Sequence, residues 1–326
     1  MNISTILSTT DFILEGFSDH NDHQILFFVV FLTVYVICLM GNTLIVLITL
    51  ASPKLHSPMY FFLSNLSVTD MSLISVVIPQ LLHNLLDEKK TISFIGCIAQ
   101  VYFFISFAGV ECFILTLMAY DRYVAVCKPL HYVTIMSRTL CIQMVAISWI
   151  TNLTNSVLHT LLIARLSFCK SHIIQHFFCD LTPLYKLSCS DITVNKLVIF
   201  TEGSLIVALP FLLTLISYIH IIWTIIKISS FTKQEAAFST CSAHLTSVIL
   251  FYGTMICIYF RPSSSYAIAS DKVAAILYTV FTPTVNPFIY SLRNKDVKRE
   301  MKKLFNKSTV KSKIVIADEN KFKTIK

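Results

Sequence analysis

Seven long apolar segments restrict the fold of this chain more than any other feature of its sequence. A helix needs about 20 residues to cross a hydrocarbon core of about 30 Å, and each segment reaches that length. Backbone polar groups inside lipid must be satisfied within the segment, so such spans are helices. The segments lie at approximately residues 25–50, 58–83, 97–124, 140–163, 196–226, 238–260 and 272–292. The sequence therefore predicts an all-α membrane protein, a seven-transmembrane helix bundle.

The distribution of charge predicts the orientation of this bundle in a plasma membrane. Only 13% of the residues are charged, about half the share of a soluble domain. Residues 1–24 contain no Lys or Arg, whereas residues 293–326 are rich in both. The positive-inside rule makes residues 1–24 an extracellular N-terminus, 25–292 the bundle, and 293–326 a cytosolic tail that begins with a short amphipathic helix 8. This basic tail favours anionic membrane lipid over nucleic acid as its partner. Asn2 begins a glycosylation sequon on the predicted outer side.

Four cysteines fall on the predicted outer side, where the compartment is oxidising, and an even set of this kind indicates two disulfides. One precedes the third segment, and three lie in the outer loop at about residues 164–195. Spacing leaves all three possible pairings open. His172 and His176 precede Cys179 in a pattern that resembles a metal site. Two histidines alone make a poor site, and Cys179 is needed for a disulfide. No metal is therefore predicted. The four cysteines are Cys97, Cys169, Cys179 and Cys189.

Two carboxyl groups are predicted at mid-membrane, where ionisable residues are functional candidates. At a rise of about 1.5 Å per residue, Glu111 lies roughly 16 Å from Arg122, and Asp70 lies roughly 18 Å from Pro58. Asn42 and Asn286 fall near the same depth. Two close carboxylates in a low dielectric require a shared proton or a bound cation. We expect either a proton or cation site, the only cofactor predicted, or a purely structural network of hydrogen bonds.

A ligand cavity is predicted nearer the outer side, along one face of the third segment. Phe104, Ile105, Ala108 and Gly109 would give it apolar walls with few polar groups, which suits a small hydrophobic ligand. Core packing is the alternative for any one of these positions. Glu202 lies roughly 12 Å deep in the fifth segment. It is predicted either to contact ligand or to pair with the outer loop or a neighbouring helix.

Several motifs, in a fixed order along nearly the whole chain, resemble those of the olfactory (odorant) receptors. The resemblance is to the tetrapod-type group of this family, which belongs to the rhodopsin-like (class A) G-protein-coupled receptors. It implies a receptor that binds a small odorant and activates a stimulatory heterotrimeric G protein, which raises cyclic AMP. The motifs are PMYFFLSNLSVTD (58–70), MAYDRYVAVCKPLHY (118–132), HFFCD (176–180), SY (217–218), AFSTCSAHL (237–245), FYG (251–253) and PTVNPFIYSLRNKDVK (283–298).

The resemblance also implies roles for individual residues. Cys97 should bridge to Cys179, and Cys169 to Cys189. In the inactive state Asp121 and polar groups of the sixth segment should hold Arg122, which is released when that segment swings outward. A buried or half-buried ion pair adds little net stability, but it can form a bistable element. The implied activation switch consists of Asp121, Arg122, Tyr218, Asn286, Pro287 and Tyr290.

The family's odorant contacts also map onto this chain, with two departures from its usual pattern. Tyr252 occupies the toggle position in FYG, where its hydroxyl could contact ligand or a backbone group. Ala236 replaces the usual lysine and leaves Lys233 as the nearest base, which bears on coupling strength. The implied ligand-binding residues are Phe104, Ile105, Ala108, Gly109, Glu202, Ile206, Tyr252, Met255 and Tyr259.

Three other functions were weighed. A receptor of the same fold for a non-odorant ligand outside the nose has the same sequence features. A transporter should contain an internal repeat with paired broken helices, which this sequence lacks. An intramembrane hydrolase needs a nucleophile and base or a metal triad, whereas the histidines here are scattered over different segments, so no enzyme is predicted.

Overall fold

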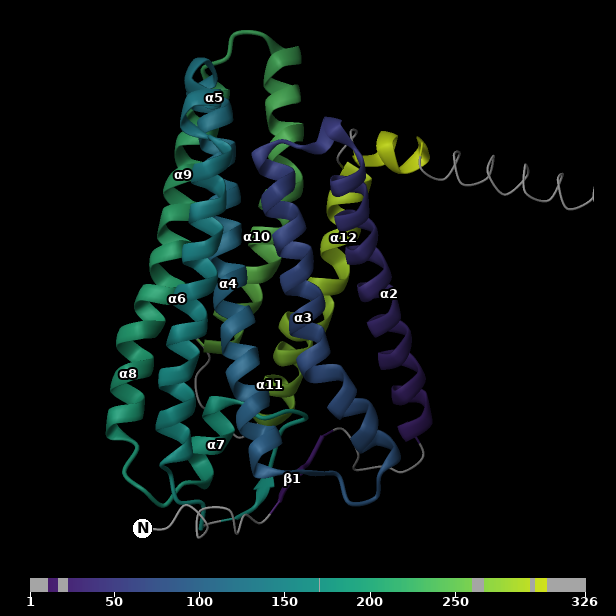
Figure 1. The fold of residues 1–326 in the computed structure, drawn as a ribbon, viewed down its shortest axis with the longest axis vertical. Helices are drawn as coiled ribbons and strands as arrows, with labels where there is room; N and C mark the ends of the chain where they lie inside the picture. The colour runs from purple at the N-terminus through teal and green to yellow at the C-terminus, as the bar shows by residue number, and fades with distance from the viewer. Residues whose placement is uncertain (1–10, 17–22, 170, 260–266, 294–296, 304–326) are drawn as a thin grey trace, which may run out of the picture.

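The computed structural model describes residues 11–16, 23–169, 171–259, 267–293 and 297–303. Over these residues seven helical spans run side by side along the long axis of the molecule (Figure 1). The first four are α2 (Gln24–Ala51), α3 (Pro58–Leu86), α4 (Phe94–Cys127) and α6 (Arg138–Ala164). The last three are α8–η4–α9 (Thr193–Gly203, Ser204–Ala208, Leu209–Ile226), α10 (Phe231–Tyr259) and α11–η5–α12 (Ala267–Ile276, Leu277–Phe281, Thr282–Arg293). Each predicted apolar segment overlaps one span, so the helical bundle is confirmed.

The helices differ in how strongly composition alone marks them as membrane-crossing. Among the described residues, 5 helices are long and apolar enough by themselves, and a sixth is reached when α6 is joined to the bent segment before it. In α10 the apolar stretch is shorter and covers Cys241–Ile256. The polar residues in the first part of α10 account for this difference, because they are part of the helix but not of its apolar stretch.

Side chains at the first turns explain where several helices begin. The Ser93 hydroxyl accepts a hydrogen bond from the Gly96 backbone N–H at the start of α4, and Ser137 does the same for Leu140 in α6. Proline at the first position of α3 has the fixed φ that a helix start requires. Three short elements connect helices at the end predicted to face the cytosol: η2 (Pro53–Leu55), η3 (Pro129–His131) and α5 (Tyr132–Ile135).

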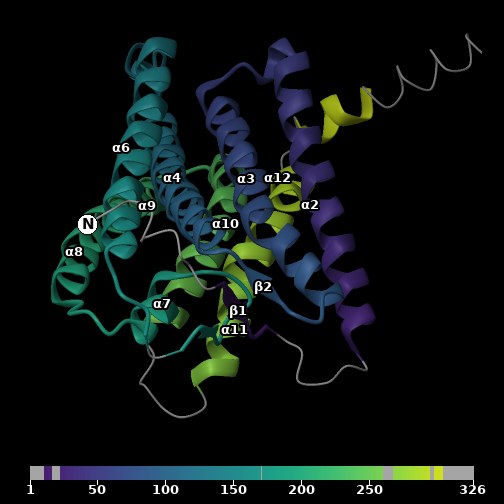
Figure 2. The same cartoon turned by 60° about the horizontal axis from the view of Figure 1, so that its bottom comes forward.

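A small three-stranded sheet lies at the outer end, which the sequence had not predicted. Its order is β2 (Thr91–Ile92), β1 (Phe12–Leu14), β3 (Ile173–Ile174), with β1 antiparallel to β2 and parallel to β3. Phe12 and Leu14 are buried in an apolar cluster under this sheet. With the outer end turned forward, the sheet, α7 (Leu181–Leu187) and α11 gather over the mouth of the bundle (Figure 2).

The seventh span packs closely on the first. A Cβ placed on Gly41 would lie 3.1 Å from the Pro287 Cβ, so glycine makes this close approach of α2 to α12 possible without displacing the proline ring. The Asn42 side chain donates to the carbonyl of Pro283, which ties the same two spans together. Pro287 lies inside α12, where its ring removes one backbone hydrogen bond of the helix.

Residues 297–303 are helical beyond the bundle, where an amphipathic helix 8 was predicted. In Figure 1 this segment turns away from the axis of α12. Val297 is fully buried and Met301 packs against the main core cluster. Ser52 donates to a carboxylate oxygen of Glu300 at 3.1 Å, which fastens the segment to the turn after α2.

Candidate functional site

A cavity of about 800 Å³ opens between the helices at their outer ends. Its walls come from α4, α6 and the fifth, sixth and seventh spans, and segments of the outer loop cover it. Most of the positions expected to contact ligand lie on this wall. They are Phe104, Ile105, Ala108, Gly109, Glu202, Ile206 and Met255.

Tyr252 is not among the residues that line this cavity, contrary to the expectation for it. Its ring packs on Phe211 at 4.7 Å between centroids, and only 4% of its surface is exposed. Its hydroxyl lies near Thr116 and Thr214, in the contact between α4 and α9. The aromatic packing draws the side chain into the helix interface and away from the cavity. The Tyr259 side chain is outside the described part of the structure.

Two π-helical turns border the cavity from opposite spans. The segment η4 contributes Ile206 and Val207, and η5 contributes Tyr278 and Thr279. A π-turn widens the helix by one residue and is frequent at functional sites. Here the two turns direct side chains of the fifth and seventh spans into the space between them.

Aromatic rings form one apolar wall of the cavity. Phe104 of α4 packs on Phe178 of the outer loop at 4.9 Å and edge-on to Tyr278 at 6.0 Å. These distances fall within the range at which aromatic pairs attract. The apolar wall therefore joins α4, the outer loop and the seventh span.

A charged pair interrupts the apolar lining. Nε2 of His159 in α6 lies 3.2 Å from Oε2 of Glu202 in α8, within ion-pair distance. Among the described residues neither Glu202 Oε2 nor His159 Nδ1 has a partner with hydrogen-bond geometry. Glu202 thus lines the cavity and lies beside a residue of a neighbouring helix, and its contact with a ligand stays a prediction.

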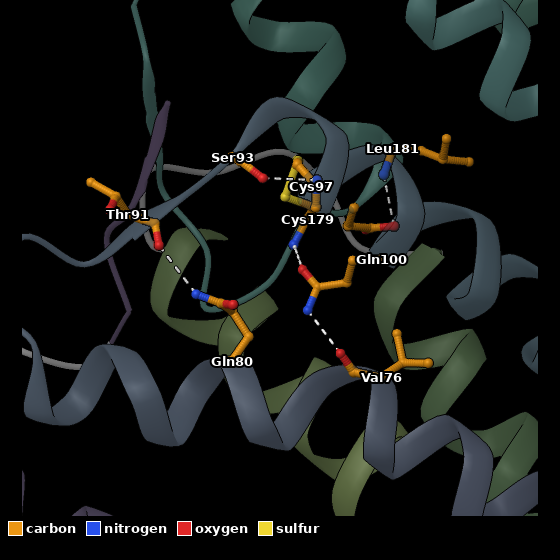
Figure 3. The surroundings of a disulfide bond; sticks show 10 residues. Val76, Gln80, Thr91, Ser93, Cys97, Gln100, Cys179 and Leu181 are labelled. Carbon is orange, nitrogen blue, oxygen red and sulfur yellow. Dashed lines mark hydrogen bonds between the residues drawn. A yellow bond between two sulfur atoms is a disulfide. The ribbon is translucent and has the colours of Figure 1, made fainter. Parts of the chain in front are cut away.

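The roof of the cavity is held by a disulfide and a glutamine. Cys97 at the start of α4 is bonded to Cys179 of the outer loop, the pairing that the motif resemblance implies, and Cys169 is bonded to Cys189. Gln100 accepts from the Cys179 backbone N–H at 2.8 Å and donates to the Val76 carbonyl at 2.9 Å (Figure 3). One side chain therefore joins α3, α4 and the loop.

His176 lies in the roof and faces the cavity. Its ring stacks on Phe177 at 4.7 Å and stands edge-on to Phe178 at 4.6 Å. Burial lowers the pKa of His176 to about 3, and the ammonium groups of Lys272 and Lys186 act in the same direction. The imidazole is therefore neutral at physiological pH.

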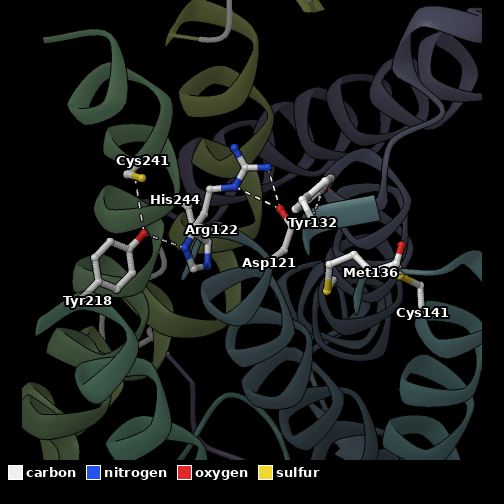
Figure 4. A network of polar contacts seen from close by, with 8 residues as sticks. All are labelled: Asp121, Arg122, Tyr132, Met136, Cys141, Tyr218, Cys241 and His244. Atoms are coloured by element: carbon white, nitrogen blue, oxygen red, sulfur yellow. Dashed lines mark hydrogen bonds and ion pairs between the residues drawn. The ribbon is translucent and has the colours of Figure 1, made fainter. Parts of the chain in front are cut away.

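The opposite end of the bundle, predicted to face the cytosol, contains the residues of the predicted switch (Figure 4). Arg122 donates to Asp121 at 2.6 Å, and Tyr132 of α5 donates to the other oxygen of Asp121 at 2.7 Å. Asp121 is fully buried. Among the described side chains no hydrogen bond joins Arg122 to the sixth span, and His244 Nδ1 of α10 bonds the Tyr218 hydroxyl of α9 at 2.7 Å.

Comparison with known proteins identifies the family. Residues 31–308 match a family model described as olfactory receptor. Human olfactory receptor 1J4 is 50% identical over 305 residues, which are 94% of this chain and 97% of that protein. Human olfactory receptor 1L3 is 48% identical and rat olfactory receptor 1468 is 46% identical, each over 94% of this chain and, respectively, 94% and 97% of the relative.

The chain belongs to the olfactory receptor family. Members of this family are seven-transmembrane G-protein-coupled receptors, so the protein is a multi-pass membrane receptor for odorants and not an enzyme. The family resemblance of the motifs is confirmed, as is the fold class that the apolar segments predict.

The polar layer of the receptor lies between the cavity and the switch. Asp70 accepts from the Asn286 amide at 3.0 and 3.3 Å, which joins α3 to α12. Glu111 is fully buried, and it lies close enough to Asp70 for the two charges to interact. Among the described residues neither carboxyl oxygen of Glu111 has a hydrogen-bond partner. Asn42 bonds Pro283 instead of either carboxyl. Oxygen donors of this kind suit a small hard cation.

A metal centre in the outer loop is not supported by the described residues. The Cys179 sulfur is committed to a disulfide, and no group of three or more potential ligands is found among the residues that the structure describes. His172 instead supplies a backbone carbonyl to the N–H of Ile13 in β1.

Sequence reasoning missed three residues that shape the cavity: Gln100, His159 and His176. All three are polar side chains within or beside apolar segments. The spacing of Asn152, Asn155 and His159 on one side of α6 was the available signal, because residues at i, i+3 and i+7 share a helix face. This spacing is a weaker indication of a binding site than Glu202, the single acidic residue of the fifth segment.

Proposed function

We propose that the receptor binds a small, mostly hydrophobic odorant in the cavity and thereby activates a stimulatory, olfactory-type G protein that raises cyclic AMP. The cavity carries this proposal. Its volume of about 800 Å³ falls within the usual range of about 300–1,000 Å³ for ligand sites, and its lining combines apolar and aromatic side chains with polar and charged ones.

The switch at the cytosolic end supports the coupling step. Asp121 and Tyr132 hold Arg122 on its own helix, and Tyr218 is held by His244. Release of both contacts as α10 moves outward would open a groove for the C-terminal helix of the G protein. Tyr290 is buried beside Ser247 of α10 and would turn toward Arg122 in that state. Ligand binding shifts this balance only through its different affinity for the two states.

The orientation follows from charge. We place residues 1–24 outside the cell, residues 25–292 in the plasma membrane and residues 293–326 in the cytosol, where basic residues contact anionic lipid. The glycosylation sequon at Asn2 lies outside the described residues. The same applies to the side chains of Ala236 and Lys233, whose effect on coupling strength stays a prediction.

The polar layer is proposed as a proton or cation site that senses the receptor's state. Two fully buried carboxyls, Asp70 and Glu111, require a proton or a cation between them. Asp70→Asn and Glu111→Gln should each change the response of signalling to sodium or pH. Wild-type responses to both ions in both variants would exclude this role.

A cyclic AMP reporter in cells that express the receptor tests the function. A broad odorant panel should contain compounds that raise cyclic AMP in the wild type but not in Arg122→Ala at equal surface expression. Unchanged signalling in that variant would contradict the proposed switch.

A further inference from the structure

We propose that the receptor selects small apolar amines, which bind in the cavity as ammonium ions against the Glu202 carboxylate. This inference rests on the proposed function, because it names the ligand class for the same cavity. It is carried by the geometry of the His159–Glu202 pair and by the charges of the cavity wall.

The charged groups of the lining are predominantly acidic. Four carboxyl residues and a single lysine, Lys186, contribute to the described wall. A second lysine near the mouth, Lys272, donates to the backbone carbonyls of Glu15 and Gly16 at 2.8 and 2.7 Å. A cavity with this balance attracts cations and disfavours carboxylates. The four carboxyl residues are Glu15, Asp180, Glu202 and Asp271.

These carboxyls are not equivalent. Asp180 caps α7 by accepting from the Leu181 backbone N–H at 2.8 Å, so it already has a structural role. Glu15 and Asp271 lie near the outer mouth, beside Lys272. Glu202 belongs to the fifth span, and 26% of its side chain is exposed to the cavity. It is therefore the carboxyl placed to meet a ligand among the apolar walls.

The pairing with His159 leaves the charge of Glu202 uncompensated. Only 6% of the His159 side chain is exposed, and among the described residues its Nδ1 has no partner. A protonated imidazole would carry N–H donors on both nitrogens, and the one on Nδ1 would be buried without an acceptor. A neutral imidazole avoids this cost, with its Nε2 still 3.2 Å from Oε2 of Glu202. It positions the carboxylate and leaves its negative charge for a ligand.

The remaining surface suits the apolar body of such an amine. Ile206 and Val207 of η4 lie about one helical turn after Glu202 in the same span, and Phe104 and Met255 line the same cavity. An ammonium donates a charge-assisted hydrogen bond to the carboxylate, about twice as strong as the neutral bond of an alcohol. A carboxylic acid of the same skeleton meets repulsion instead.

Thermal unfolding of the purified full-length receptor tests this selectivity without signalling. The probes are two matched sets: benzylamine, benzyl alcohol and benzoate; and cyclohexylmethylamine, cyclohexylmethanol and cyclohexanecarboxylate. We expect each amine to raise the Tm at about tenfold lower concentration than its alcohol, and the acids to have the least effect. Glu202→Gln should remove the amine preference, and Glu202→Asp should keep part of it.

Glu88→Gln is the matched control, since it removes the same charge from an exposed residue between α3 and β2, outside the cavity lining. Its amine preference should stay within about threefold of the wild type. Equal stabilisation by amine and alcohol in both sets, no stabilisation by either amine, or an unchanged preference in Glu202→Gln would each overturn the inference. The Tm of each unliganded variant reports whether it folds.

The cyclic AMP panel separates this inference from the proposed function. If amines bind through Glu202 but no compound raises cyclic AMP, the ligand class stands and the signalling assignment fails. If neutral odorants raise cyclic AMP and the amines show no preference in binding, the signalling assignment stands and the ligand class fails.

Discussion

Lowering the pH should loosen the outer loop over the cavity through His176. In the closed loop the pKa of this imidazole is lowered to about 3 by burial and by nearby ammonium groups. In an opened loop the ring meets water and its pKa returns to the ordinary value of about 6.5. The opened loop therefore binds a proton at a pH where the closed loop does not.

The sign and size of the effect follow from these two values. A histidine whose pKa is lowered in the closed state costs stability as pH falls through 6.5, and the cost grows until about pH 3. At about pH 5.5, one unit below the ordinary value, the closed loop loses about 1.4 kcal/mol relative to neutral pH. Its opening equilibrium should shift about tenfold.

Hydrogen exchange on the purified receptor measures this shift. The Cys179 backbone N–H donates to Gln100, and the Glu15 N–H donates to the Ile174 carbonyl, so both amides report on closure of the roof. Their protection factors should fall about tenfold between about pH 7.5 and 5.5, after correction for intrinsic exchange. His176→Gln should show a much smaller fall.

The matched variant is needed because Asp180 acts in the opposite direction. Burial raises the pKa of its carboxyl, so its own titration stabilises the closed loop as pH falls. The difference between wild type and His176→Gln isolates the histidine. An equal fall in both proteins, or none in the wild type, would refute the reasoning.

Three further predictions concern the scaffold. Cys97→Ser removes a disulfide that closes 82 residues and should cost about 4.5 kcal/mol of stability. Cys169→Ser, whose disulfide closes 20 residues, should cost about 3.3 kcal/mol. Thermal unfolding of each variant measures the two losses, and the reverse order would contradict the loop-length argument. In Gly109→Ala the new methyl collides with the Asn152 side chain and should cost about 1–3 kcal/mol, whereas Gly253→Ala, with no heavy atom within 4 Å, should be tolerated. Lys272→Met removes two hydrogen bonds to the carbonyls that follow β1. The free energy of opening residues 11–16, measured by hydrogen exchange, should fall by about 2 kcal/mol. Unchanged exchange there would show that the lysine does not hold the strand.

The positions of the helical spans were accessible from the sequence because membrane insertion is a local, length-dependent property. Each apolar segment must satisfy its backbone internally, whatever its neighbours are. The charge pairing of Arg122 with Asp121 was also predictable, since the two residues are adjacent in the chain. The disulfide partners were not fixed by spacing, and only the family resemblance pointed to the pairing that the structure contains.

Tertiary structure decided where the polar side chains meet. His159 and Glu202 lie on different spans, and Asp70 meets Asn286 across 216 positions of sequence. Tyr252, expected at the cavity, is instead held in a helix interface by Phe211. The sheet at the outer end and the two π-turns depend in the same way on contacts between distant segments. A linear pattern of apolar residues records which segments enter the membrane, but the rotation and packing of each helix determine which polar groups face one another.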